Sequence, residues 1–209
     1  MHKFRISLLV LMVLSLSAVA LANSTNVTML YLHPGGNNSG GVFTYPYYFS
    51  INGGAPTALM CDSYMNHISA GQTWNASVTG LLKGKGLFGK DFLDYKAAGI
   101  IFLSVMNGTV DANVGNWAVW NLFTKGITSD AAVLALDAKA IYLAKHTPSS
   151  ALKGLVLYTP VGAKPGSGPQ EFIGYNPRGT VVPEPGSLLL LSTGLTGLGL
   201  LVRRRFSHS

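Results

Sequence analysis

The sequence predicts an α+β ectodomain: a β-rich, sheet or sandwich-like domain with two or three helices inserted in its second half. Short aromatic and β-branched runs, separated by Gly- and Asn-rich turns, fill the first half of the chain. The apolar residues then change to the period of about 3.6 that is typical of helices. Uncharged apolar segments lie near both ends, where they indicate a signal peptide and a transmembrane helix. Strands followed by helices indicate the α+β class.

Four strands are expected in the first half of the domain. The turn 52–54, Asn-Gly-Gly, is a strong hairpin signal and joins the second strand to the third. Pro46 interrupts the second run and indicates an edge strand or a bulge, because proline cannot donate to a sheet ladder. The expected strands are 26–31, 42–51, 55–63 and 73–82.

Three helices and two closing strands are expected in the second half. Asp91 stands at the start of the first helical pattern, and Ser129-Asp130 precedes the third as a capping signal. Lys125-Gly126 ends the second pattern, and Pro148 ends the third. The expected helices are 91–106, 114–123 and 129–146, and the expected strands are 155–159 and 170–174.

The N-terminal segment 1–22 has the three parts of a secretory signal peptide. Lys3 and Arg5 provide the positive start, and an apolar stretch follows. Ala20 and Ala22 form a small-x-small cleavage site. An uncleaved signal anchor is the alternative. Export predicts use of the Sec machinery and places the domain, 23–181, outside the cytoplasm.

The C-terminal segment contains an uncharged span followed by a basic stop. Residues 188–202 carry no charge and lie near the lower limit of about 17–25 residues needed to cross a bilayer. Arg203, Arg204 and Arg205 resist translocation and stay on the cytoplasmic side, followed by a short tail, 206–209. The segment is therefore predicted to associate with the inner membrane, and an ordinary single-span anchor remains an alternative.

Pro183, Glu184 and Pro185 precede this span and are predicted to form an extended tripeptide just outside the membrane. Segment 182–205 resembles the PEP-CTERM sorting signal of Gram-negative bacteria in motif order, spacing and position. The resemblance implies recognition at the tripeptide by exosortase, a transpeptidase-like membrane enzyme. It also implies delivery to the cell surface or extracellular matrix, with extracellular polysaccharide as a candidate partner.

The basic composition is largely a consequence of targeting. The formal net charge is +7, but residues 23–182 contribute only +3 of it. No nucleic-acid partner is expected from so small an excess. The scattered histidines and the absence of paired carboxylates at ligand spacing predict no metal and no cofactor.

Cys61 is the only cysteine, so the chain cannot form an internal disulfide. The residue ends an apolar strand, where a cysteine is most often a small buried hydrophobic side chain. His67 follows six residues later and allows a cysteine hydrolase as a further hypothesis. No recognised catalytic motif occurs, and we therefore expect a protein that is not an enzyme.

Four short motifs resemble the core of a PEP-CTERM ectodomain and, more distantly, bacterial thioester adhesin domains. They are Met-Cys-Asp at 60–62, Ala-Gly-Gln-Thr-Trp-Asn-Ala at 70–76, Tyr-Lys-Ala-Ala-Gly at 95–99 and Trp-Ala-Val-Trp-Asn-Leu-Phe at 117–123. The resemblance implies a cysteine–glutamine crosslink with Cys61 as the cysteine and position 116 as the glutamine. This chain has Asn116 there, one methylene shorter. An inactive scaffold and a thioester-like covalent site both stay open.

The sequence therefore predicts an exported, exosortase-sorted and non-enzymatic surface or matrix protein. The alternative is an adhesin or binding module with a Cys61-based covalent site.

Overall fold

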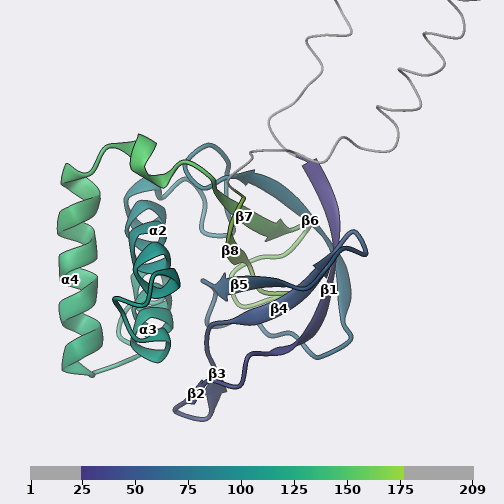
Figure 1. Ribbon diagram of the computed structural model, residues 1–209, viewed down its shortest axis with the longest axis horizontal. Helices are drawn as coiled ribbons and strands as arrows, with labels where there is room; N and C mark the ends of the chain where they lie inside the picture. The colour runs from purple at the N-terminus through teal and green to yellow at the C-terminus, as the bar shows by residue number, and fades with distance from the viewer. Residues whose placement is uncertain (1–24, 177–209) are drawn as a thin grey trace, which may run out of the picture. The chain divides into compact units, whose positions relative to one another are not determined.

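The computed structural model describes residues 25–176 (Figure 1). The predicted signal peptide with Ala20 and Ala22, the sorting tripeptide, the transmembrane helix and the arginine stop lie outside these residues. Eight strands are present in the described part of the chain: β1 (Thr25–Pro34), β2 (Asn38–Ser39), β3 (Val42–Phe43), β4 (Tyr47–Ile51), β5 (Thr57–Cys61), β6 (Thr73–Gly80), β7 (Leu155–Pro160) and β8 (Phe172–Tyr175).

Six of the strands close into an antiparallel barrel in the order β1-β4-β5-β8-β7-β6. The long strand β1 closes it, because its first part pairs with β6 and its later part pairs with β4. The register of β1 against β4 shifts between Tyr31 and His33, as at a β-bulge. A closed barrel leaves none of these six strands as an edge. The expectation of a β-rich sheet with late helices is therefore confirmed, and the sheet closes into a barrel.

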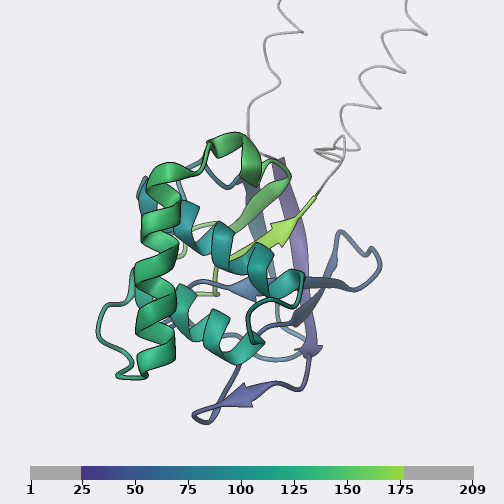
Figure 2. The same cartoon turned by 60° about the vertical axis from the view of Figure 1, so that its left-hand side comes forward.

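Three helices lie together on one side of the barrel, with α4 outermost (Figures 1 and 2). They are α2 (Phe92–Met106), α3 (Ala112–Phe123) and α4 (Ala131–His146), and a short 3-10 turn, η1 (Ser149–Leu152), leads back to β7. Asp91, Asp111 and Asp130 cap the three helices, and each side chain accepts a backbone N–H of the first turn.

The domain has two apolar cores, one inside the barrel and one between the barrel and the helices, because alternate residues of a strand face opposite sides. Cys61 and Phe172 point into the barrel, where they pack with Met29, Phe49 and Leu59. Their neighbours Met60 and Ile173 point outward and pack with side chains of α2 and α3. This two-sided burial explains why 57–61 reads as an almost continuous apolar run.

The segment 42–51 differs from the prediction of one strand. It contains two strands, β3 and β4, and Pro46 lies between them. β4 is not an edge strand, because it pairs with β1 on one side and with β5 on the other. Proline is tolerated here because it stands before the ladder and not within it. Within residues 25–176 no helix has the length and apolarity needed to span a membrane.

Candidate functional site

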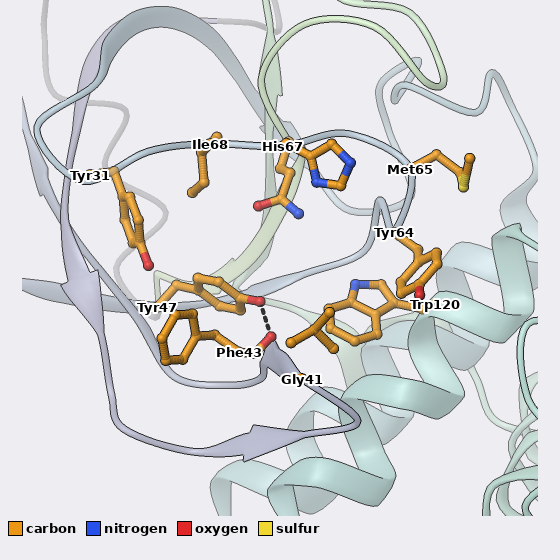
Figure 3. A pocket seen from close by; sticks show the side chains of 11 residues that line it. Tyr31, Gly41, Phe43, Tyr47, Tyr64, Met65, His67, Ile68 and Trp120 are labelled. Atoms are coloured by element: carbon orange, nitrogen blue, oxygen red, sulfur yellow. Dashed lines mark hydrogen bonds between the residues drawn. The ribbon is translucent and has the colours of Figure 1, made fainter.

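A pocket of about 470 Å³ opens at one end of the barrel (Figure 3). Its walls come from the end of β1, the start of β4, the segment around β3, the loop after β5 and α3. The first and last described strand residues, Thr25 and Tyr175, lie at the opposite end, since the pairing runs Thr25–Val78 and Tyr175–Leu155.

The pocket wall is aromatic and uncharged. Its lining residues are Tyr31, Gly41, Val42, Phe43, Tyr47, Tyr64, Met65, His67, Ile68, Trp120 and Gln170. Phe43 and Met65 stand at the rim, with 47% and 54% of their surfaces exposed, whereas Trp120 is 2% exposed. The Tyr47 hydroxyl donates a hydrogen bond to the Phe43 carbonyl, which holds the β3 segment over this end of the barrel (Figure 3).

Asn66 fixes the loop that forms one wall of the pocket. The side chain is buried, and its amide donates to the carbonyls of Lys164 and Ser167 at 3.0 and 3.1 Å. Its carbonyl accepts the Gly166 N–H at 2.9 Å. One asparagine thus joins the loop after β5 to the loop before β8.

Cys61 lies in the same core as three of the pocket's aromatic residues, Tyr31, Tyr47 and Trp120. It pairs with Phe172 across β5 and β8, which makes Gln170 its diagonal neighbour two positions along the opposite chain. Diagonal neighbours on one face lie within reach of long side chains. The ladder continues beyond Cys61, since the Asp62 N–H donates to the Glu171 carbonyl at 3.2 Å.

The side chains of Cys61 and Gln170 meet at one atom, the carbonyl oxygen of Ser63. The Cys61 Sγ lies 3.7 Å from this oxygen, and the Gln170 Nε2 donates to it at 3.4 Å. Gln170 is only 7% exposed, and its remaining surface lines the pocket. The structure therefore brings a carboxamide of glutamine length and the only thiol of the chain to the same backbone carbonyl.

Burial raises the pKa of the Cys61 thiol to about 12, and the adjacent Asp62 carboxyl, once ionised, adds to the rise. The Trp120 indole N–H and Ser63 oppose it. At neutral pH the thiol is protonated. His67 is exposed at the pocket, and no hydrogen bond joins it to Cys61 in the described structure.

The Asn116 side chain contacts Cys61 at its backbone carbonyl and not at its thiol. Its Nδ2 donates to the Cys61 carbonyl at 2.9 Å, and its Oδ1 accepts the Tyr45 N–H at 2.7 Å. One turn earlier on α3, the Asn113 Oδ1 accepts the Thr44 hydroxyl at 2.6 Å. The two asparagines therefore attach α3 to the segment before β4 and to the end of β5. Both polar ends of the Asn116 amide are occupied by these backbone groups.

A buried carboxyl pair occupies the other face of β5 and β8. Glu171 accepts the Tyr95 hydroxyl at 2.6 Å, the Leu87 N–H at 2.8 Å and the Thr159 hydroxyl. The Asp62 oxygens accept no hydrogen bond from residues 25–176. Burial and the adjacent Glu171 charge raise the pKa of Asp62 well above its usual value. Burial also raises the pKa of Glu171, although its three hydrogen-bond donors oppose this rise. Asp62 has no such donors, so the arrangement favours Asp62 as the carrier of the proton.

This proton makes the stability of the domain depend on pH. The folded chain retains the Asp62 proton above the unfolded pKa of 3.8, so the free energy of unfolding falls as pH rises from there through the folded pKa. The loss is at most about 1.4 kcal/mol per pH unit for one proton. We expect Asp62→Asn to unfold at higher urea concentration than the native chain at pH 8, with a smaller difference at pH 5.

Glu171→Gln is the matched control, because an amide cannot accept all three donors of Glu171. It is expected to unfold at lower urea concentration at pH 5 and at pH 8. Parallel pH profiles for the native chain and Asp62→Asn would show that the Asp62 proton contributes nothing.

The described residues contain no candidate metal site. No group of three or more His, Cys, Asp or Glu side chains that could hold an ion occurs among residues 25–176.

The described residues form a β-barrel domain in which Cys61 and Gln170 share the Ser63 carbonyl, and the sequence continues into a C-terminal targeting segment. That segment is a PEP-CTERM protein-sorting motif, whose family model matches residues 181–205. The motif supports export and sorting by exosortase, and it implies membrane association before processing. No curated protein and no solved structure matches the chain.

The sequence interpretation missed Gln170 as a site residue. It stands directly before Glu171 at the start of the last predicted strand, and nothing in the one-dimensional pattern pairs that strand with 57–61. The sequence did contain a signal for Gln170. The thioester resemblance requires a side chain of glutamine length, which Gln170 has and Asn116 does not.

Proposed function

We propose that this protein is a non-enzymatic component of the cell surface or extracellular matrix of a Gram-negative bacterium, delivered there through its C-terminal sorting motif. The single observation that carries the proposal is the PEP-CTERM motif at residues 181–205. The apolar stretch after Lys3 and Arg5, with its Ala20-Leu21-Ala22 site, supports export by the same route.

Two features of the domain support a non-enzymatic role. A nucleophilic cysteine needs a depressed pKa or an adjacent base. The Cys61 thiol has a raised pKa, and within residues 25–176 its hydrogen-bond contacts are to Ser63. The Asp62–Glu171 pair is buried on the outer face of the barrel strands, away from the pocket lining. Glu171 is committed to internal donors, which suits a structural role.

Export is tested by adding protease to intact cells and then to lysed cells of the host. We expect the domain to be degraded, or to be recovered from the medium, without lysis, whereas a cytoplasmic marker survives until lysis. A matched chain lacking residues 1–22 should stay protected in intact cells. Protection of the native chain until lysis would contradict the proposal.

A second candidate function is an adhesin with a covalent acyl site, and the shared contact of Cys61 and Gln170 favours it. In the step proposed, Cys61 Sγ bonds to the Gln170 Cδ and the C–N bond of the amide breaks. The thiol proton leaves with the NH2 group as ammonia, so the step needs no oxidant or further reactant. The thioester could then acylate an amine, which would restore the thiol. Gln170 is favoured over Asn116 because both ends of the Asn116 amide are bound to backbone groups.

A further inference from the structure

We propose that the pocket at the barrel end binds a neutral sugar unit of a polysaccharide. This inference rests on the proposed surface role, and it adds a binding site and a ligand class to that role. The pocket's volume of about 470 Å³ falls within the range of about 300–1,000 Å³ that is usual for small-molecule sites.

The uncharged lining of the pocket disfavours charged ligands. No Asp, Glu, Lys or Arg lines the pocket. A cationic amine, a phosphate or a uronate would lose its hydration there without gaining an ionic partner, which is costly. His67 is the only lining residue that can become charged near neutral pH, and it is exposed. The lining is therefore complementary to an uncharged ligand.

The aromatic groups match the two-sided character of a sugar ring, which has apolar C–H faces and a polar rim of hydroxyls. Tyr64 and Trp120 pack with ring centroids 5.3 Å apart and form an apolar wall. Phe43, whose carbonyl accepts the Tyr47 hydroxyl, adds a partly exposed aromatic side chain to the same lining. Aromatic rings offer a large apolar surface to a ligand. Tyrosine and tryptophan also carry a polar O–H or N–H group at the edge of the ring.

Polar groups stand at the same pocket to receive hydroxyls. Tyr31 and His67 both line the pocket, and Figure 3 shows them well apart, with Ile68 between them. The Gln170 side chain also lines the pocket, and in the described structure its Nε2 donates to the Ser63 carbonyl. A few neutral donors and acceptors on an apolar wall give orientation without requiring charge.

The test titrates the full chain, purified from the host, with neutral probes: glucose, galactose, N-acetylglucosamine, cellotriose and chitotriose. A charged trisaccharide of alginate serves as the comparison. Intrinsic tryptophan fluorescence is the readout because Trp120 lines the pocket, and calorimetry checks it. We expect saturable binding of at least one neutral probe. Stronger binding of a trisaccharide than of its monomer would show that an internal unit of a polymer is recognised.

Phe43→Ala is the informative variant, because the side chain is 47% exposed and its removal leaves the folded core intact. We expect it to weaken binding about tenfold, as loss of one stacking contact of about 1.4 kcal/mol would. Tyr142→Ala removes a more exposed aromatic side chain, at 62%, on α4 away from the pocket, and should bind like the native chain.

Three outcomes would overturn the inference: no saturable binding of any neutral probe, equal affinity in Phe43→Ala, or preference for the alginate trisaccharide. Concentration-dependent dimerisation that Phe43→Ala abolishes would instead assign the pocket to a second copy of the chain. If the chain fails these binding tests but added protease still degrades it on unlysed cells, the proposed surface role is unaffected. A chain protected in intact cells contradicts that role whatever it binds.

Discussion

The covalent acyl site, the second candidate function, predicts that the mature chain purified from its host weighs one ammonia less than its sequence and carries no alkylatable thiol after denaturation. The physical reason is the position of Gln170, whose amide and the Cys61 thiol both contact the Ser63 carbonyl. Formation of the bond between the Cys61 Sγ and the Gln170 Cδ consumes the thiol and releases the amide nitrogen as ammonia in the same step. Burial favours retention of such a bond, because it keeps water from the acyl carbon.

Methylamine then identifies the acyl partner without a mutation that could unfold the protein. Added to the denatured chain, it attacks the acyl carbon, and the Cys61 sulfur leaves and recovers a proton. Tandem mass spectrometry should find the methylamide on Gln170 and a free thiol on Cys61. A methylamide on Asn116 would support the partner expected from the sequence resemblance.

Cys61→Ser and Gln170→Ala are the matched controls, and each should have the full mass of its sequence. A native chain of full mass, with a thiol that alkylates completely after denaturation, would contradict the covalent site. The protein would then be an unmodified scaffold in which Cys61 is a buried apolar side chain.

Replacing Pro183, Glu184 and Pro185 by alanine is expected to retain most of the chain in the inner-membrane fraction. Proline disfavours helix, so the two prolines are predicted to keep the tripeptide extended, and alanine would instead favour a helix through it. The processing enzyme would lose both the backbone shape and the carboxylate that it recognises. Fractionation followed by immunoblotting measures the distribution between membrane and surface.

Two comparisons make this result specific. A host lacking exosortase should retain the native chain in the same fraction, and the alanine variant should show no further change in that host. Lys83→Ala changes a residue in the loop after β6, far in sequence from the motif, and should be sorted normally. Surface delivery of the alanine variant at the native level would contradict recognition at the tripeptide.

The sequence was sufficient for much of the fold because its elements carry local signals. Asp91 and Asp130 cap helices where expected, and the Asn-Gly-Gly turn at 52–54 joins two paired strands. Barrel closure could not be predicted, since it depends on β1 pairing with both β4 and β6. Strand pairing over such distances depends on tertiary packing and has no local signature.

The same limit explains the candidate site. Cys61 and Asn116 were singled out by type and motif, and the structure does bring these residues together. Gln170 lies 109 positions beyond Cys61, and only the antiparallel register of β5 and β8 makes the two diagonal neighbours. The pocket is equally non-local, because its aromatic residues come from β1, β3, β4, α3 and the loop after β5.

The most direct measurement of the central claim, that the chain is processed and sorted through its C-terminal motif, is the identity of its last residue at the cell surface. Intact-mass and C-terminal peptide analysis of surface protein should place the end within or near 183–185. The apolar span and Arg203, Arg204 and Arg205 should be missing, and all should be present in a host without exosortase. Surface protein that still ends at Ser209 in both hosts would contradict the account.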